Sequence, residues 1–238
     1  YLGKVSRVEP SLQAAFIDFG RERHGFLSFN DIQSDYYQIP QSDLQKIKEE
    51  EEKVREELLK ESENEENKNI NEDNLNLNDP VEKKVEQDLN NNDNVVQKKY
   101  PIKKYKIQEV IKPNQVILVQ VLKDERGFKG AALSTFISIA GKYIVLMPNT
   151  PKGGGISRKI FNPGDRKKIR AILNQIIIPK EMGIIVRTAG ANKTKNEIEK
   201  DLENLIKIWE TIKENAMNSI APSLIHKESE IIKRTLRD

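Results

Sequence analysis

The sequence predicts a mixed fold: a small five-stranded β-barrel, interrupted by a long acidic insert and followed by a small α/β domain. Three observations predict it. Short β-like runs fill the first forty residues and return near residue 116. A polar, asparagine-rich stretch separates these two groups of runs. After residue 138, strand-like and helix-like patterns alternate. A length of 238 residues is compatible with one or two domains.

The predicted barrel strands are short apolar runs bounded by glycine, proline or charged turns. They cover residues 3–8, 14–19, 24–29, 116–122 and 131–138. Pro10 and Gly20 separate the first three runs. Five short strands with such turns are typical of a small barrel.

Side chains of the second and third predicted strands alternate between two faces. Ile17 lies on one face, whereas Phe16 shares the other face with Asp18, which marks that face as solvated. The same alternation places Phe26 opposite to Leu27. Exposed rings beside cations form a stacking platform for unpaired bases. The alternative is a register shifted by one residue, which buries both rings.

Charge is divided unevenly along the chain. The 40 Lys and Arg and the 37 Asp and Glu give a net charge of +3. Residues 41–100 hold 10 basic and 18 acidic side chains, which leaves 30 basic (40 less 10) and 19 acidic (37 less 18) elsewhere. The insert therefore carries −8 and the rest +11. A basic body of this kind suits a polyanionic partner such as nucleic acid.

The insert, residues 38–100, is expected to be disordered over most of its length. Residues 41–100 contain 11 Asn and no Gly, and residues 63–97 have too little apolar surface to offset their ordering entropy. Residues 44–61 have the composition of a charged helix. A long loop is tolerable because each doubling of its length costs only about 0.6 kcal/mol. The insert is either a solvated loop or a tail that binds a partner.

The α/β domain is predicted from apolar strands at residues 143–147 and 183–187 and from helical spacing over residues 165–176. Thr194 and Glu197 form a capping box that begins a further helix. The apolar positions of that helix are Ile198, Leu202, Leu205, Trp209 and Ile212. We interpret Trp209 as a core residue, and a last element begins near Glu228.

Composition excludes several kinds of chemistry. Absence of cysteine excludes disulfides, thiolate zinc sites and thiol nucleophiles. His24 and His226 are the only histidines, which leaves little scope for a histidine-rich metal centre. No apolar run approaches the ~20 residues that a membrane helix needs, and no signal-peptide pattern is present. The chain opens without Met, in what reads as the middle of a strand, so we expect a longer parent protein.

Six sequence blocks follow one another in a recognisable order. The first covers residues 3–20 together with His-Gly-Phe-Leu at residues 24–27. The others are residues 129–141, 143–149, 154–158, 185–190 and 224–229. The first block resembles the OB-fold RNA-binding module of the ribosomal protein S-one type. Together the six blocks resemble the ribonuclease E/G family of bacterial endoribonucleases.

This resemblance implies a domain order and an activity. An RNA-binding OB-fold domain would occupy residues 1–137, a 5′-sensor α/β domain residues 138–226, and the truncated start of a ribonuclease-H-like subdomain residues 227–238. The parent protein would be an Mg²⁺-dependent, single-strand-specific endoribonuclease for RNA decay and rRNA and tRNA processing. Its catalytic carboxylates and its structural Zn²⁺ link would lie beyond Asp238. We therefore expect no catalytic or metal-binding residues in this chain and no cleavage by it alone.

The resemblance also assigns two sets of site residues. The RNA-binding set matches Phe16, Phe26 and Lys129. The set that would line a 5′-monophosphate pocket matches Gly141, Val145, Arg187 and Thr188.

These residue types suit a terminal phosphate. A phosphomonoester carries about −1.5 to −2 charge and three acceptor oxygens. Arg187 can offer it a planar, two-pronged donor, and Thr188 a hydroxyl and a backbone amide. Gly141 would leave room for close backbone approach, and Val145 would form an apolar wall under the terminal base. The alternative is that Arg187 and Thr188 are a strand-end pair engaged in internal salt bridges.

The implied partner is single-stranded RNA with a 5′-monophosphate. A homo-oligomeric parent, partners from an RNA-degradation complex, and a cytoplasmic location with peripheral association at the inner membrane are further expectations. Two rival interpretations stay open. One is a non-catalytic RNA-binding module of a translation or transcription factor. The other is a scaffold whose acidic insert recruits proteins.

Overall fold

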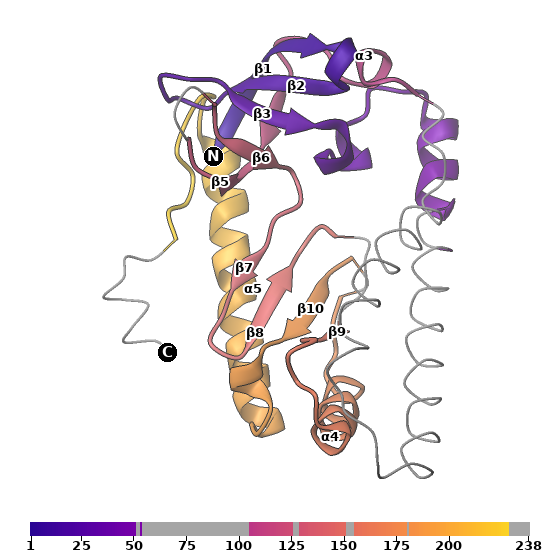
Figure 1. Ribbon diagram of the computed structural model, residues 1–238, viewed down its shortest axis with the longest axis vertical. Helices are drawn as coiled ribbons and strands as arrows, with labels where there is room; N and C mark the ends of the chain where they lie inside the picture. Colours follow the sequence, from indigo (N-terminus) through magenta and orange to yellow (C-terminus); the bar gives the residue numbers. More distant parts are fainter. Residues whose placement is uncertain (51–52, 54–104, 126–128, 151–154, 180, 229–238) are drawn as a thin grey trace, which may run out of the picture. The chain divides into compact units, whose positions relative to one another are not determined.

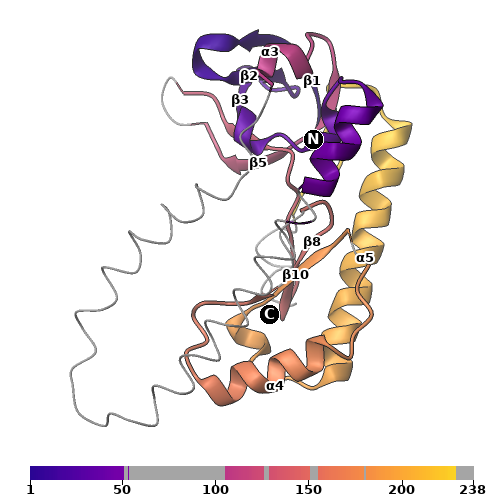
Figure 2. The same ribbon diagram turned by 90° about the vertical axis from the view of Figure 1, so that its right-hand side faces the viewer.

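The computed structural model describes residues 1–50, 53, 105–125, 129–150, 155–179 and 181–228 (Figures 1 and 2). Residues 1–40 and 105–238 form one compact unit, and residues 41–104 form a second. Within the second unit, residues 41–50 are helical, close to the predicted start of a charged helix at residue 44. The disorder predicted for most of the insert falls on residues outside the described ranges.

A six-stranded sheet occupies the first part of the larger unit, in the order β4-β1-β2-β3-β6-β5. Its strands are β1 (Leu2–Glu9), β2 (Ala14–Asp18), β3 (Gly25–Ser28), β4 (Val116–Leu118), β5 (Gln120–Lys123) and β6 (Ala132–Ser134). Strands β4 and β5 form opposite edges of this order, although Val119 alone separates them in sequence. The sheet must therefore curl until its two edges approach each other, as Figure 1 shows.

The single strand predicted over residues 116–122 is wrong, because the run divides at Val119 into β4 and β5. The Val119 backbone N–H donates to the Tyr1 carbonyl at 2.9 Å, and its carbonyl accepts from the Tyr1 amino group at 2.9 Å. On one side of this point β4 pairs with β1, and on the other side β5 pairs with β6. Strand β4 is apolar and β5 is half polar, but neither pattern indicates the change in neighbour. Among the described residues, six strands form this sheet where five were predicted.

The concave side of the curled sheet encloses an apolar core that includes Val5, Ile17, Phe19, Leu27 and Leu133. Short 3-10 helices η1 (Pro10–Leu12), η2 (Phe29–Asp31) and η3 (Ser34–Tyr36) connect or follow the first strands. Helix α3 (Ile107–Val110), which the sequence did not predict, adds two buried side chains to the core. The Gln38 N–H donates to the Val110 carbonyl at 2.9 Å. The first residue of the insert and the helix that follows the insert are therefore in contact.

A four-stranded sheet forms the second part of the same unit, in the order β7-β8-β10-β9. Its strands are β7 (Ile139–Ala140), β8 (Ile144–Met147), β9 (Gly155–Ile156) and β10 (Gly183–Val186). Strand β10 pairs antiparallel with β8 and parallel with β9. The apolar strands predicted near residues 143–147 and 183–187 are thus confirmed as β8 and β10.

Helix α4 (Pro163–Leu173) and helix α5 (Lys195–Asn218) contribute side chains to one core cluster with this sheet. Helix α4 begins two residues before the predicted start because the Asn162 side chain caps it, accepting from the Gly164 N–H at 2.9 Å. The predicted capping box of Thr194 and Glu197 is present at the start of α5. In both views α4 lies beside the N-terminal end of α5 (Figures 1 and 2).

Helix α5 buries the predicted apolar stripe against two clusters. Its first turns pack Ile198, Leu202 and Leu205 into the core of the four-stranded sheet. Its last turns place Ile212 and the half-buried Trp209 in a smaller cluster that also contains Leu2 and Ile225. Leu2 and Ser223 exchange backbone hydrogen bonds of 2.9 and 3.0 Å, so the chain after α5 returns to β1. The element predicted near Glu228 falls mostly on residues after 228, outside the described ranges.

Candidate functional site

Phe16 and Phe26 lie opposite each other on β2 and β3, on the face of the curled sheet that points away from the core. They are paired across the two strands, and their ring centroids are 6.1 Å apart in an edge-on arrangement. Phe26 is 37% exposed and Phe16 is half-buried, whereas their neighbours Ile17 and Leu27 are fully buried. The predicted strand alternation is confirmed, and the shifted register that buries both rings is excluded.

A bulge in β1 brings Arg7 to the same face. The pairing of β1 with β2 shifts between Val5 and Arg7, which places Arg7 opposite Phe16. The guanidinium carbon of Arg7 lies 4.4 Å from the centre of the Phe16 ring. We call Arg7, Phe16 and Phe26 the aromatic face. Sequence alternation could not identify Arg7, because the bulge changes which side chains share a face.

Lys129 is exposed in the segment that leads into β6. This segment runs beside β3: the Phe26 N–H donates to the Ala131 carbonyl at 2.8 Å, and Phe26 pairs with Ala132. Lys129 therefore precedes by two residues the backbone that contacts Phe26. Lys129 is thus close in sequence to the segment that pairs with Phe26, and its role in RNA binding stays a prediction.

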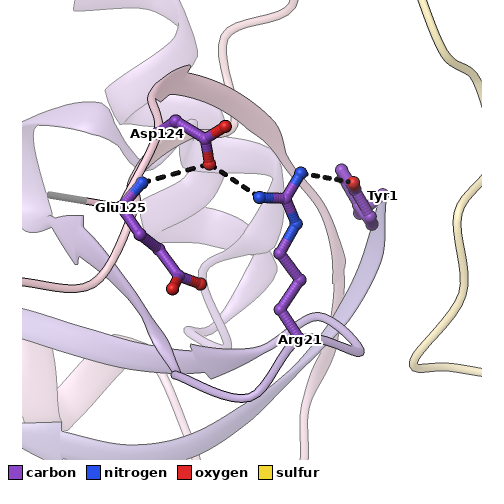
Figure 3. A network of polar contacts seen from close by, with 4 residues as sticks. All are labelled: Tyr1, Arg21, Asp124 and Glu125. Atoms are coloured by element: carbon purple, nitrogen blue, oxygen red, sulfur yellow. Dashed lines mark hydrogen bonds and ion pairs between the residues drawn. The ribbon is translucent and has the colours of Figure 1, made fainter.

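An ion pair fixes the turn after β5. Arg21, from the loop between β2 and β3, donates from Nη1 to Asp124 Oδ1 at 2.6 Å and from Nη2 to the Tyr1 hydroxyl at 3.0 Å (Figure 3). Asp124 Oδ1 also accepts from the Glu125 N–H at 3.1 Å. Arg21 therefore joins the first residue of the chain, the β2–β3 loop and the end of β5. We interpret it as a structural cation of the curled sheet.

The second candidate site is a cavity of about 390 Å³ in the α/β region, lined by Lys142, Tyr143, Arg187, Ala189 and Lys193. We call it the Arg187 cavity. Three cationic side chains converge there around one aromatic ring. The amino groups of Lys193 and Lys142 lie 4.9 and 5.6 Å from the centre of the Tyr143 ring. Such a lining has the charge to bind an anion and the aromatic surface to contact a base.

The turn between β7 and β8 orients Arg187. Arg187 Nη1 donates to the Gly141 carbonyl at 2.7 Å, and the Arg187 backbone N–H donates to the Tyr143 carbonyl at 2.8 Å. A guanidinium carries five N–H donors, so the bond to Gly141 orients the group and leaves donors for a ligand. The alternative interpretation required an acidic partner for Arg187, whereas the partner found here is a backbone carbonyl.

Asp201 of α5 holds this turn in place. Its Oδ2 accepts from the N–H groups of Tyr143 and Ile144 at 2.8 and 3.1 Å, and its Oδ1 accepts from that of Lys142 at 3.2 Å. A Cβ atom at Gly141 would lie 2.6 Å from the Asp201 carboxylate. A glycine at this position therefore leaves room for the carboxylate that fixes the turn, and the role of Gly141 in a 5′-monophosphate pocket stays a prediction.

The other predicted pocket residues lie close to the cavity without lining it. Val145 pairs with Ile185 across β8 and β10. By strand alternation, the side chains of Val145 and Ile185 lie on the same face of the sheet as that of Arg187. Thr188 is exposed and begins the 3-10 helix η5 (Thr188–Gly190). Among the described residues, only Arg187 of the predicted set lines the cavity.

Sequence reasoning missed Lys142, Tyr143, Lys193 and Asp201. One signal for Asp201 was available, since it lies three residues after Ile198 and four before Leu205, on the apolar stripe of α5. An acidic residue at such a position indicates a specific partner, because burying an unpaired charge is costly. Nothing in the sequence could show that its partners are backbone N–H groups.

No group of three or more His, Cys, Asp or Glu side chains in the described ranges is placed to hold a metal ion. The described helices likewise include none with the length and apolar character needed to cross a membrane.

Comparisons with known proteins point to one family. The model of the ribonuclease E/G family matches residues 138–238. Ribonuclease E of Haemophilus influenzae is 37% identical over all 238 residues, which cover 19% of that protein. Ribonuclease E of Escherichia coli is also 37% identical over the whole chain, which covers 17% of it. Ribonuclease E of Synechocystis is 42% identical over 132 residues, which are 56% of this chain and 19% of that protein.

Residues 138–238 match the ribonuclease E/G family, and the whole chain is similar to ribonuclease E, in agreement with the resemblance of the six sequence blocks. The chain spans about a fifth of the length of these three relatives.

Proposed function

We propose that this chain binds single-stranded RNA on its aromatic face and recognises a 5′-monophosphate in the Arg187 cavity. It would do so as part of an Mg²⁺-dependent cytoplasmic endoribonuclease for RNA decay and rRNA and tRNA processing. The convergence of Lys142, Arg187 and Lys193 on one cavity carries the proposal. The relatives that match the whole chain are named ribonuclease E, which supports the activity proposed for the whole protein.

The curled sheet supports an OB-fold barrel over residues 1–137, with the 5′-sensor domain over residues 138–226. The near approach of β4 and β5 on either side of Val119 is the feature expected of a small, partly open barrel. Bases stacked on its exposed rings would contribute about 1–3 kcal/mol each, whatever their identity. The barrel would therefore supply affinity for unpaired RNA without reading a sequence.

The Arg187 cavity would supply the preference for a particular RNA end. A 5′-monophosphate brings about −1.5 to −2 charge into a site with three cations. A charge-assisted hydrogen bond contributes about 1.5–3 kcal/mol. A 5′-hydroxyl end offers neither the charge nor the acceptor oxygens, so it would gain nothing from the cavity.

Cleavage would need groups outside the 238 residues. In the described ranges, no group of three or more His, Cys, Asp or Glu side chains could hold a metal ion. The pure chain should leave single-stranded RNA intact in the presence of Mg²⁺. Mg²⁺-dependent cleavage by the pure chain would contradict this part of the proposal.

The test of the proposed function compares two RNAs that differ only at the 5′ end. The wild-type chain should bind a 5′-monophosphorylated 10-mer about 10- to 100-fold more tightly than its 5′-hydroxyl counterpart. Arg187→Ala should abolish this preference and leave the affinity for the 5′-hydroxyl RNA unchanged. Arg158→Ala, which removes an exposed arginine of the same region, is the matched control.

Two outcomes would contradict the proposal: no preference in the wild-type chain, or a preference that survives Arg187→Ala. The first is what a non-catalytic RNA-binding module predicts.

A further inference from the structure

A second cavity, of about 440 Å³, adjoins the Arg187 cavity and shares Lys193 with it. We call it the α4 cavity. Helix α4 contributes Lys168, Ala171 and Ile172 to its lining, and the turn before α5 contributes Ala191, Asn192 and Lys193. Both figures show α4 beside this end of α5 (Figures 1 and 2). The two cavities are therefore neighbours that meet at one cationic side chain.

Contacts on both sides hold Lys193 at this junction. Its amino group donates to Glu197 Oε1 at 3.2 Å and lies 4.9 Å from the centre of the Tyr143 ring. The pKa of Lys193 is raised, first by the hydrogen bond to Glu197 and then by its contact with Tyr143. The side chain is still 35% exposed, so its charge can reach a ligand. Lys193 thus presents a fixed positive charge between the two cavities.

The lining of the α4 cavity suits a nucleoside. Ala171, Ile172 and Ala191 offer apolar surface to the face of a base, and the Asn192 amide can both donate and accept at its edge. Cations lie at Lys168 and Lys193. Apolar surface with a few polar groups and flanking cations is the combination that a nucleotide requires, since it has a flat base and anionic ends.

We propose that Lys193 binds the phosphodiester that follows the 5′-terminal nucleotide, and that the α4 cavity holds the second nucleotide of the RNA. The ligand class is a 5′-phosphorylated oligoribonucleotide of at least two nucleotides. The inference rests on the proposed function of the Arg187 cavity, which would bind the terminal phosphate. It adds a second contact, to the nucleotide after the 5′ end. Recognition of the 5′ end would then require that the RNA is single-stranded at its second nucleotide as well.

The test uses four small ligands and the 238-residue chain, with binding followed by NMR titration. The ligands are uridine 5′-monophosphate (pU), uridine 3′,5′-bisphosphate (pUp), the 5′-phosphorylated dinucleotide pUpU and the unphosphorylated UpU. The wild-type chain should bind pUp about two- to fivefold more tightly than pU, which is the range of a partly exposed ion pair. It should bind pUpU more tightly still, and UpU more weakly than pU.

Lys193→Gln should weaken the binding of pU, because Lys193 also lines the Arg187 cavity, and should in addition remove the gain of pUp over pU. Lys167→Gln, on the same helix as Lys168 but outside both cavities, is the matched control and should keep the gain. Ala171→Trp fills the α4 cavity and should remove only the further gain of pUpU over pUp. The NMR spectrum of each variant shows whether its fold is retained.

Equal affinities for pU and pUp in the wild-type chain, or a gain that survives Lys193→Gln, would overturn this inference while the proposed function stands. A gain of pUpU over pUp that survives Ala171→Trp would overturn the placement of the second nucleotide. If pU fails to bind, or binds equally well after Arg187→Ala, the proposed function itself fails and the inference fails with it.

Discussion

The aromatic face and the Arg187 cavity differ in how firmly their cations are held. On the aromatic face, Arg7 is placed by a β-bulge and lies against the Phe16 ring. In the cavity, Arg187 bonds to the Gly141 carbonyl, and Asp201 holds the turn that contains this carbonyl. Arg7 therefore lies on an open surface, whereas Arg187 is oriented by hydrogen bonds that lead through the β7–β8 turn to Asp201 of α5.

Under the proposed function, this difference predicts a division of labour between the two sites. An open pair of rings accepts any base, because every base has a flat face to stack. An oriented guanidinium in a concave site favours a ligand with matching charge and acceptor geometry, since the ordering cost has already been met in the fold. Changes on the face should therefore alter affinity for all single strands alike, whereas changes in the cavity should alter only the preference between RNA ends.

The largest effect is expected from removal of both rings of the aromatic face. The double variant Phe16→Ala/Phe26→Ala should weaken the binding of 5′-monophosphate and 5′-hydroxyl RNA equally. Loss of one stacked base corresponds to about 5- to 150-fold, because one stacked base contributes about 1–3 kcal/mol. The ratio of the two affinities should not change. Fluorescence anisotropy with labelled 10-mers measures both quantities.

The matched control is Phe161→Ala, which removes a ring that is 86% exposed in the α/β region. It should leave both affinities unchanged. If the double variant instead loses much of its thermal stability and keeps its RNA affinity, the rings act in folding and the division of labour is wrong.

Breaking the support of Arg187 should have the next largest effect. Asp201→Asn replaces a carboxylate that accepts three backbone N–H bonds with an amide that has one acceptor oxygen. The preference for 5′-monophosphate RNA should fall about tenfold, because Gly141 no longer holds the guanidinium. Affinity for 5′-hydroxyl RNA should not change.

Gly141→Ala tests the same support from the other side, since its Cβ would meet the Asp201 carboxylate. It should reproduce the loss of preference, and Glu203→Gln, an exposed change on the same helix, should not. An unchanged preference in both Asp201→Asn and Gly141→Ala would show that Arg187 needs no support from the turn.

In both sites, sequence pattern predicts some features and misses others. Strand alternation placed Phe16 and Phe26 on the outer face, and helical spacing placed Ile198 and Leu202 in the core, because both patterns depend on neighbouring residues alone. The division of the 116–122 run at Val119, the bulge that moves Arg7 and the clamp by Asp201 depend on backbone groups from distant segments. Local pattern carries no information about such pairs.

A smaller effect is expected from the cation of the aromatic face. Arg7→Gln should weaken the binding of both RNAs about two- to fivefold. This corresponds to about 0.5–1 kcal/mol for an exposed cation over the ring of a bound base. If Arg7 also contacts a phosphate, the slope of log affinity against log salt should fall by about 0.7. Arg7→Lys keeps the charge and should keep the slope. A change in the preference between RNA ends would contradict the separation of the two sites.

The smallest effect concerns acid stability of the α/β region, through Glu197 at the start of α5. Its Oε2 accepts from the Thr194 N–H and hydroxyl, each at 3.0 Å, and its Oε1 accepts from Lys193 at 3.2 Å. The pKa of Glu197 is lowered from the ordinary value of 4.5, first by the backbone bond from Thr194 and then by the hydroxyl and Lys193. Because the folded pKa is the lower one, the carboxylate stabilises the fold fully above about pH 4.5. That stabilisation is lost as the pH falls through the folded pKa.

Glu197→Gln should therefore lower the melting temperature at pH 6, and the difference from the wild-type chain should shrink below pH 4.5, because a glutamine does not titrate. Circular dichroism melts at pH 6, 4.5 and 3 measure this difference, with Glu203→Gln as the control on the same helix. The six-stranded curled sheet should be unaffected, so RNA binding on the aromatic face at pH 6 should stay as in the wild-type chain. A difference in melting temperature that is as large at pH 3 as at pH 6 would show that the Glu197 charge does not stabilise α5.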